Sequence, residues 1–300
     1  MTEHLKTIIK ISYNILLLFC ANLFFQLPLY AQNLVNTNDT LMVYEAMMAP
    51  KIDGFVSDLC WQEITWVPIN YVWIPYGAPC DTTSFVGKYK CCWSSKTNRL
   101  YFFIEVKDNA FVDGFVPGKE PDIYNFDIAE VFIDEDASGG LHIFDAVGKD
   151  TLEWGANAEN AFTYHIYAPF PAEGKTSTHP YVADLAGKSW DDVHHVNYAS
   201  HLPEFILRRE GNTAFWEFSL IVYDSTFDIA LHKFNEVKLF PGKEIGFSVA
   251  YCDNDSADGV RDAMFGSDWE PAPGNLHWMN ADYFRKVKLM PHQTVSVHKK

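Results

Sequence analysis

The 300-residue chain has little positive charge: 23 Lys and Arg stand against 39 Asp and Glu, which gives a formal net charge of −16. Proteins that bind nucleic acid or anionic lipid neutralise phosphates with clustered Lys and Arg. The charge balance therefore disfavours both kinds of partner. Neutral ligands and divalent cations remain compatible with such a surface.

The chain also lacks the short motifs of common catalytic sites. It has no Gly-x-Ser-x-Gly elbow and no Gly-rich phosphate loop. Glycoside hydrolysis requires two carboxyl groups about 5–9.5 Å apart. Glu130 and Asp134 lie on one face of an expected strand, but four residues of strand separate them by about 13 Å. Asp127 lies on the opposite face. We therefore expect a protein that is not an enzyme, although acids from other strands leave this question open.

Long apolar runs are absent except near the N-terminus, where residues 15–29 are largely apolar and follow Lys6 and Lys10. A small residue suited to cleavage ends residues 1–31. This order is typical of a secretory signal peptide, and the run is shorter than the roughly 20 residues of a membrane span. We therefore expect cleavage and export to the periplasm, the cell surface or the medium. A lipid anchor at Cys20 ranks second.

Cysteine is scarce, and the five that follow the expected cleavage site are Cys60, Cys80, Cys91, Cys92 and Cys252. Export permits disulfides, but an odd count leaves at least one thiol unpaired, and spacing does not determine the pairing. Cys91 and Cys92 are adjacent on an expected strand, so they face opposite sides. Buried free thiols are an equally open alternative.

Helical periodicity is weak throughout, with one short candidate at residues 57–63. Strand-like runs rich in β-branched and aromatic residues recur instead, separated by turns. They cover residues 85–93, 100–106, 127–134, 162–167, 214–222, 245–251 and 284–289. Many strands with almost no helix predict an all-β fold, an antiparallel, jelly-roll-like β-sandwich. We place one domain at residues 49–300, after a lead-in at residues 32–48.

Residues 169–212 break this pattern with a stretch rich in Pro and Gly. A long irregular segment in a compact domain is usually a binding loop or a tolerated insertion, so we expect an irregular insertion here. It contains Trp190-Asp191-Asp192-Val193-His194-His195, in which two His beside two Asp raise a metal site as an alternative. Adjacent His on a loop rarely converge on one ion, so a solvated loop is favoured.

The run at residues 127–134 is the most informative strand. Side chains alternate along a strand, so Ala129 and Val131 share an apolar face while Glu130 and Phe132 share the other. An acid beside an aromatic ring on an exposed face suits a ligand with hydroxyls and an apolar ring face, and sugars have both. The alternative is an edge strand with a solvated Glu130.

An acidic loop at residues 253–259 has the density of oxygen ligands that calcium requires. It is not a helix–loop–helix calcium loop, because it follows a strand and Met264 stands where the bidentate Glu belongs. A structural calcium ion in this domain and a solvated turn without an ion therefore both stay open at this point.

Taken together, these segments resemble the family 9 carbohydrate-binding modules and related sugar-binding proteins. The resemblance is carried, in order, by Ile52-Asp53-Gly54 with Asp58 and Trp61, by Leu100-Tyr101 leading to Asp108, by the strand at 127–134, by Trp216-Glu217-Phe218, by Ile245-Gly246-Phe247 leading to Asp253, and by the strand from Phe284 to Leu289. Each piece is weak alone, but six in this order are specific, and they span about residues 49–290.

The resemblance implies a β-sandwich that holds the end of a sugar chain between two aromatic rings. At the matching positions, Tyr124 and Trp278 are the implied aromatic platforms. Glu130 and Asn275 are the implied partners of sugar hydroxyls. The family normally has an Arg on the next strand, and His165 is the nearest equivalent here. Aromatic rings cover the C–H face of a sugar, while Glu and Asn satisfy its hydroxyls.

The resemblance also implies bound calcium, and we predict Asp108, Asp253 and Asp255 as its ligands. No organic cofactor is expected. Modules of this family are often attached to xylanases and other glycoside hydrolases, so such enzymes are the expected protein partners.

The other tryptophans have a simpler interpretation. Trp61, Trp93 and Trp216 lie in apolar strands or helices and are expected in the core. Trp278 lies in a loop rich in Pro and Gly, where exposure and ligand contact are favoured. His165 on its own is more often a bonded core histidine than a ligand contact.

Two other classes of function stay open. A haem-binding electron-transfer module on a similar sandwich would use Met264, Met279 or His277 as axial ligands, although no Cys-x-x-Cys-His attachment motif exists. A structural or adhesive surface domain would show no glycan preference. An accessory protein that assists glycoside hydrolases is a variant of the sugar-binding interpretation.

Overall fold

The computed structural model describes residues 39–142, 144–145, 153–154, 161–184, 196–227, 232–256 and 259–293, which belong to the unit Asn38–Lys300. The expected signal peptide at residues 1–31 and the alternative metal site at His194-His195 lie outside these residues. No helix in the described ranges is long and apolar enough to cross a bilayer.

Two sheets account for most of the described chain. The eight-stranded sheet contains β1 (Leu41–Tyr44), β3 (Tyr71–Ile74), β6 (Ile128–Asp134), β9 (Phe162–Tyr167), β11 (Tyr181–Asp184), β14 (Glu244–Asp253), β15 (Ala263–Gly266) and β16 (Arg285–Met290). The six-stranded sheet contains β2 (Val67–Ile69), β4 (Phe85–Ser94), β5 (Arg99–Asp108), β10 (Thr176–Ser177), β12 (Glu204–Glu210) and β13 (Thr213–Leu220). A separate pair joins β7 (Phe144–Asp145) to β8 (Glu153–Trp154).

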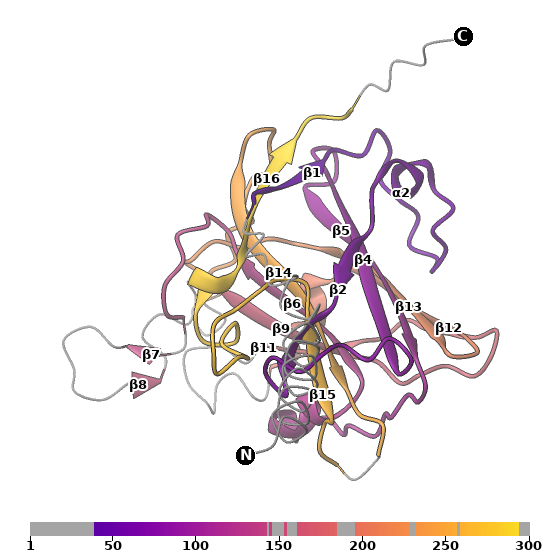
Figure 1. Ribbon diagram of the computed structural model, residues 1–300. Helices are drawn as coiled ribbons and strands as arrows, with labels where there is room; N and C mark the ends of the chain where they lie inside the picture. Colours follow the sequence, from indigo (N-terminus) through magenta and orange to yellow (C-terminus); the bar gives the residue numbers. More distant parts are fainter. Residues whose placement is uncertain are drawn as a thin grey trace, which may run out of the picture. The chain divides into compact units, whose positions relative to one another are not determined.

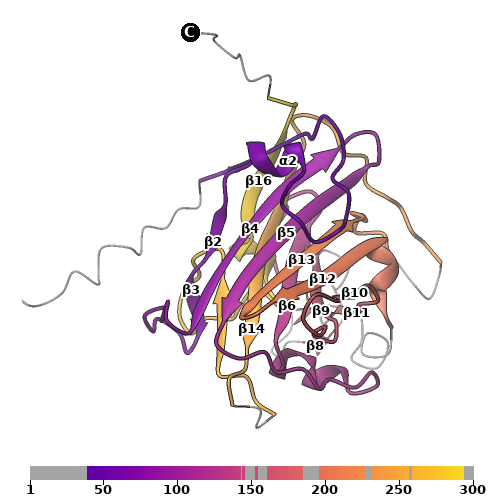
Figure 2. The ribbon, with the colours of Figure 1, turned by 90° about the vertical axis from the view of Figure 1, so that its right-hand side faces the viewer.

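The two sheets pack face to face, so the predicted β-sandwich is confirmed. Figure 1 shows β16, β14, β6, β9 and β11 running across one layer. Figure 2 shows β4, β5, β13 and β12 side by side in the other layer, with β14 and β6 behind them. Within the described sheets all strand pairs are antiparallel except β1 with β16.

The side chains between the sheets form the inter-sheet core. Ala129 and Val131 of β6 belong to it together with Phe102, Trp93 and Trp216 of the opposite sheet. The tryptophans predicted for the core, Trp61, Trp93 and Trp216, are each 0% exposed. Alternation along each strand delivers one face to this core, as the apolar pattern of the sequence predicts.

β6 also has its second face covered. It lies between β14 and β9, and all seven of its residues are buried. Its outward-facing Ile128 and Phe132 belong to a second group, the outer-face cluster. This cluster consists of Trp73, Phe115, Ile123, Ile128, Phe132, Ala161, Tyr167, Ala183, Ala250, Cys252, Met264, Ala281 and Phe284. The predicted alternation is confirmed, but the expected exposure and the edge-strand alternative are wrong, because segments distant in sequence cover this face.

The domain begins earlier than residue 49. β1 falls within the lead-in expected at residues 32–48 and pairs with β16 along its whole length. Val43 of β1 is 2% exposed and belongs to the inter-sheet core. This strand was missed because four residues carry too little periodicity to be recognised.

The stretch at residues 169–212 is not an irregular insertion in its described part. β10 and β12 lie in the six-stranded sheet, while β11 pairs with β9 in the other. A short 3₁₀ helix, η4 (Tyr198–His201), precedes β12. The Pro and Gly that suggested irregularity lie in the connections, at Pro171, Gly174, Pro180 and Pro203, rather than in the strands.

Helices are few and short among the described residues. They are α2 (Leu59–Glu63), which matches the helix expected at residues 57–63, and the 3₁₀ helices η2 (Glu120–Asn125), η4 and η5 (Ala281–Tyr283). η2 leads directly into β6, and η5 leads into β16, so both place residues beside the outer-face cluster.

The opening Ile-Asp-Gly…Trp motif is held by one buried carboxylate. Glu217 Oε1 accepts a hydrogen bond from Trp61 Nε1 at 2.8 Å, and Oε2 accepts from the backbone N–H groups of Asp53 and Gly54 at 2.9 and 2.7 Å. Burial nevertheless raises the pKa of Glu217 to about 7. The motif therefore fastens the segment before α2 to the six-stranded sheet.

The five cysteines of the described chain are free thiols, and all except Cys80 are buried. Cys91 belongs to the inter-sheet core, whereas Cys92 belongs to a third cluster with Cys60 and Trp61. The prediction that Cys91 and Cys92 face opposite sides is confirmed.

Candidate functional site

Glu130 occupies the centre of the outer face of the eight-stranded sheet. In the strand register it lies opposite Ala250 of β14 on one side and His165 of β9 on the other. His165 in turn lies opposite Ala183 of β11. Two small residues, Ala250 and Ala183, therefore flank the polar pair of Glu130 and His165, and the outer-face cluster surrounds this row.

The Glu130 carboxylate is bonded on one oxygen. His165 Nε2 lies 3.1 Å from Oε1, and Cys252 Sγ donates to the same atom at 2.9 Å. Oε2 has no hydrogen-bond partner among the described residues. Burial raises the pKa of Glu130, but the charge and hydrogen bond of His165, the charge of Arg261 and the hydrogen bond of Cys252 outweigh it, so the net pKa is lowered. Glu130 is therefore a carboxylate at neutral pH.

Arg261 and Cys252 are part of this polar group, and sequence reasoning missed both. Arg261 Nη1 lies 3.1 Å from Cys252 Sγ, and its guanidinium carbon lies 4.8 Å from the centre of the Tyr124 ring. Burial raises the pKa of the Cys252 thiol well above its usual range, so it stays protonated and can donate to Glu130. The only available signal was that Cys252 falls on the outward-facing positions of β14.

Tyr124 and Trp278 both pack against the outer-face cluster. Each is half-buried, neither is fully enclosed, and they come from segments far apart in the chain, η2 and the loop before η5. The backbone oxygen of Trp278 accepts a hydrogen bond from Thr163 of β9 at 3.5 Å. The structure therefore places both predicted platforms on the side of the sheet that carries Glu130.

The loop that carries Asn275 and Trp278 is organised by Glu270. This buried carboxylate accepts from the backbone N–H groups of Asn275 and Leu276, and its Oε2 lies 2.8 Å from His277 Nδ1. Asn275 adopts a left-handed backbone conformation with φ of 55°. Sequence reasoning missed Glu270, because nothing in the sequence relates it to backbone groups five and six residues away.

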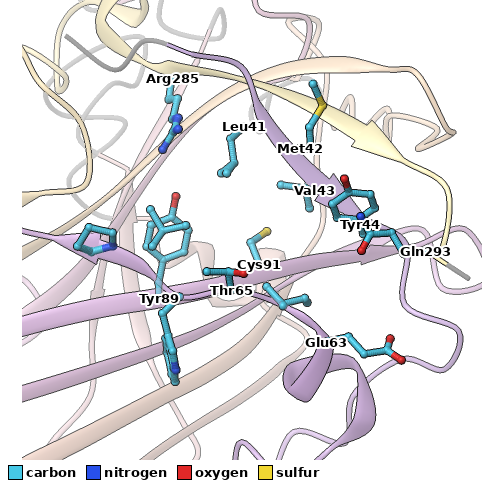
Figure 3. A pocket seen from close by; sticks show the side chains of 14 residues that line it. Leu41, Met42, Val43, Tyr44, Glu63, Thr65, Tyr89, Cys91, Arg285 and Gln293 are labelled. Atoms are coloured by element: carbon cyan, nitrogen blue, oxygen red, sulfur yellow. The ribbon is translucent and has the colours of Figure 1, made fainter. Parts of the chain in front are cut away.

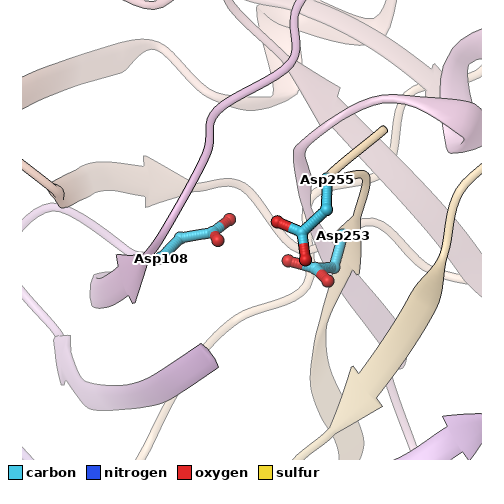
Figure 4. Close-up of side chains that lie close together, drawn as sticks. All are labelled: Asp108, Asp253 and Asp255. Atoms are coloured by element: carbon cyan, nitrogen blue, oxygen red, sulfur yellow. The ribbon is translucent and has the colours of Figure 1, made fainter. Parts of the chain in front are cut away.

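The three predicted metal ligands come together. Oxygen atoms of Asp108, at the end of β5, and of Asp253 and Asp255, at the end of β14, lie within 4.8 Å of one another. Figure 4 shows the Asp108 carboxylate directed toward the other two. Asp108 Oδ2 and Asp253 Oδ1 are buried and have no hydrogen-bond partner in the described structure.

Asp127, just before β6, adds a fourth carboxylate to this group. Its Oδ1 is also buried without a partner, and its side chain contacts Asp108. Burial raises the pKa of Asp127 to about 10, while burial followed by the charge of Asp108 raises that of Asp253 to about 8. Clustered buried carboxylate oxygens without donors are the ligand set that a hard cation such as Ca²⁺ requires. The residues therefore fit a calcium ion.

The haem candidates gain no support from their packing. His277 is 0% exposed, is stacked on Trp73 with 4.0 Å between ring centres, and bonds to Glu270. Met264 is 1% exposed within the outer-face cluster. Both side chains are therefore engaged in packing.

A separate pocket lies away from these residues. It has a volume of about 410 Å³ and lies between β1, the segment at residues 63–68, β4 and Arg285. Figure 3 shows the Tyr89 ring directed toward Arg285 in this pocket. None of the residues predicted to contact sugar or calcium lines it.

A two-layer β-sandwich is a fold shared by proteins of many functions, so the family must be identified by other means. The family model described as "Carbohydrate family 9 binding domain-like" matches residues 52–291. The chain therefore belongs to this family, and the resemblance found in the sequence is confirmed.

Solved structures show the same fold at low identity. A family 9 module from Caldicellulosiruptor kristjanssonii in complex with cellotriose is 18% identical, with a TM-score of 0.56, and the match covers 87% of this chain and 98% of that one. A structure of a module from the same organism with glucose is 17% identical, with a TM-score of 0.54 and coverage of 86% and 100%. The comparison with curated proteins gave no match.

Proposed function

We propose that this protein binds the end of a saccharide chain, without catalysing a reaction, on the outer face of the eight-stranded sheet. The observation that supports this most directly is the position of Tyr124 and Trp278. Both half-buried rings pack on the cluster that surrounds the Glu130 carboxylate. Apolar rings around a few polar groups are the usual composition of a small-ligand site.

The polar residues of the proposed site lie at two levels, one in the loop beside Trp278 and one buried in the sheet below it. Asn275 lies with Trp278 on the loop held by Glu270 and supplies an amide that both donates and accepts. Glu130 and His165 are 0% and 3% exposed, so they form the floor of the site. Contact between Glu130 Oε2 and a sugar hydroxyl requires the groups above it to move aside.

The family relatives supply the first ligand to test. Structures of other members contain cellotriose and glucose. Cellotriose is the better probe for this protein, because it offers both a chain end and neighbouring rings.

Trp278→Ala tests the site directly. The substitution removes the apolar ring face, so we expect the affinity for cellotriose, measured by isothermal titration calorimetry, to fall by about 30-fold or more. The thermal unfolding temperature should stay close to that of the wild type, because the ring is half-buried. Phe240→Ala is the matched control, since this aromatic residue is 51% exposed and lies outside the outer-face cluster. Normal binding by the Trp278 variant would contradict the proposal.

We infer in addition that Asp108, Asp253 and Asp255 hold a structural Ca²⁺. The inference is supported by the convergence of their oxygens and by the buried atoms without partners. Asp127 is a further ligand or a bonded neighbour in this arrangement. The ion would neutralise carboxylates that are otherwise costly to bury together.

We further infer that the protein acts after export, in the periplasm, on the cell surface or outside the cell. The basis is the apolar run at residues 15–29 and its basic flank. Glycoside hydrolases such as xylanases are the partners that this location and the family suggest.

A further inference from the structure

The equivalent of the family's arginine does not offer a free donor in this protein. Both ring nitrogens of His165 already face acceptors: Nδ1 lies 3.1 Å from the Thr163 carbonyl oxygen and Nε2 lies 3.1 Å from Glu130 Oε1. An imidazole has only two ring nitrogens. His165 therefore stabilises the floor of the site and has no ring nitrogen left to donate to a ligand.

Arg261 has the free donors that His165 lacks. A guanidinium carries five N–H groups, and the side-chain contacts of Arg261 in the described structure, to Cys252 Sγ at 3.1 Å and Met264 Sδ at 3.6 Å, involve Nη1 alone. Both acceptors are sulfur atoms, which are weak. The side chain is half-buried and lies over Tyr124, so its remaining N–H groups are close to the proposed aromatic platform.

The backbone beside Arg261 is tied to the segment that carries Tyr124. Asn254 Nδ2 donates to the Asn125 carbonyl oxygen at 2.7 Å, and Arg261 N donates to Asn125 Oδ1 at 3.4 Å. Asn125 is the neighbour of Tyr124 in η2. Tyr124 and Arg261 are therefore held together by backbone contacts as well as by their side chains.

The same loop begins at the carboxylate cluster. Asp262 Oδ2 accepts from the backbone N–H groups of Asp255 and Ser256 at 2.7 and 3.1 Å, and Asp262 N donates to the Asp253 carbonyl oxygen at 2.8 Å. The loop is thus closed on itself, with two predicted calcium ligands at its start and Arg261 at its end. Asp127, two residues after Asn125, places the η2 segment at the same cluster.

We propose that Arg261 is a saccharide-contacting donor, held over Tyr124 by the loop whose carboxylates Asp253 and Asp255 hold the cation. This inference rests on the proposed sugar-binding function and assigns a residue and a mode of regulation to that site. Because one loop serves both sites, calcium and saccharide affinities are coupled, and the coupling is reciprocal. The charge of Arg261 is balanced by Glu130, so the fitting ligand is a neutral sugar with adjacent hydroxyls rather than an acidic one.

The experiment measures cellotriose binding by calorimetry for three arginine variants, in Ca²⁺ and in chelator. We expect Arg261→Ala to reduce affinity at least tenfold, and Arg261→Lys to recover part of it, since Lys keeps the charge without the planar fork. Arg209→Ala is the matched control, because Arg209 also lies over an aromatic ring, with its guanidinium carbon 5.0 Å from the centre of Phe111. We expect the Arg209→Ala variant to bind cellotriose with the affinity of the wild type.

The coupling between calcium binding and cellotriose binding can be measured separately. Chelation should weaken cellotriose binding by the wild type but have little further effect on Arg261→Ala, because the calcium effect acts through that side chain. Hydrogen exchange, which needs no ligand, should slow in residues 120–127 and 259–262 when Ca²⁺ is added. An equal chelator effect in both proteins, or exchange that does not respond to Ca²⁺, overturns the coupling.

The outcomes separate this inference from the function on which it rests. If Trp278→Ala abolishes binding and Arg261→Ala binds as the wild type does, the role of Arg261 is wrong and the sugar-binding function stands. If the wild type fails to bind cellotriose, or Trp278→Ala binds normally, the sugar site itself is wrong and the inference falls with it.

Discussion

At the scale of single residues, Glu130 shows how burial changes a role. Alternation along β6 correctly predicts the face on which it lies. It does not reveal that His165, Cys252 and Arg261 gather around the carboxylate, because these residues come from other strands and a distant loop. An acid that the sequence suggests as a surface acceptor is therefore a fully buried carboxylate in the structure.

His201 allows a residue-scale prediction about pH. Its ring is 3% exposed and its Nδ1 lies 2.6 Å from the Tyr164 hydroxyl. Burial lowers its pKa to about 3. Below the unfolded pKa of about 6.5, the unfolded chain binds a proton that the folded protein does not bind, so stability falls as the pH drops from 6.5 toward 3 by about 1.4 kcal/mol per pH unit.

We therefore expect the wild type to lose about 2.3 kcal/mol more than His201→Gln between pH 6.5 and pH 4.5. Urea unfolding at the two pH values measures this difference. His179→Gln, at an exposed position, is the control and should follow the wild type. Parallel losses in the wild type and His201→Gln would show that His201 does not titrate as its burial implies.

At the scale of elements, the long strands were predictable and the short ones were not. The strand expected at residues 162–167 coincides with β9, and that expected at 85–93 differs from β4 by one residue. Ten alternating residues carry enough signal to be recognised. β1, β10 and β15 have two to four residues each, and their pairing is set by long strands already in place.

The convergence of Asp108, Asp253 and Asp255 belongs to this scale, because it depends on where β5 and β14 end. Bound Ca²⁺ should stabilise the domain by about 2.7 kcal/mol at a concentration 100 times its dissociation constant. We expect this increase in the thermal unfolding of the wild type, and little of it in Asp253→Asn. Mg²⁺ should act more weakly, since it demands a smaller octahedral site.

The same substitution should have the opposite effect in chelator. Without a cation, burial and the charge of Asp108 raise the pKa of Asp253 to about 8, so this carboxyl group is costly to ionise and a neutral Asn avoids that cost. Asp253→Asn should then be at least as stable as the wild type. Glu244→Gln, on an exposed residue at the start of β14, is the control. A variant that responds to Ca²⁺ as the wild type does would exclude this ligand set.

At the scale of the whole molecule, six weak motifs in the right order predicted the family and the fold, which no single motif could do. The family model confirms that the chain belongs to the family, and the similarity to solved structures confirms the β-sandwich fold. The sequence did not reveal Arg261, Cys252 or Glu270, because these residues act through contacts between segments that only folding brings together.

Export is the prediction that belongs to the entire chain. If residues 1–31 are a cleaved signal peptide, N-terminal sequencing of the protein recovered outside the cytoplasm should begin at Gln32. A recovered protein that still begins at Met1, or one that carries lipid on Cys20, would contradict cleavage at this position.

The bonds of Glu217 to Trp61, Asp53 and Gly54 have a consequence for how such proteins are recognised. The residues that make a chain look like a relative are those that keep its opening segment attached, on the sheet opposite the proposed ligand face. The residues that hold this segment and the residues proposed to contact a ligand therefore lie on different sheets. The opening motif therefore predicts the fold of a relative, but it does not predict which saccharide that relative binds.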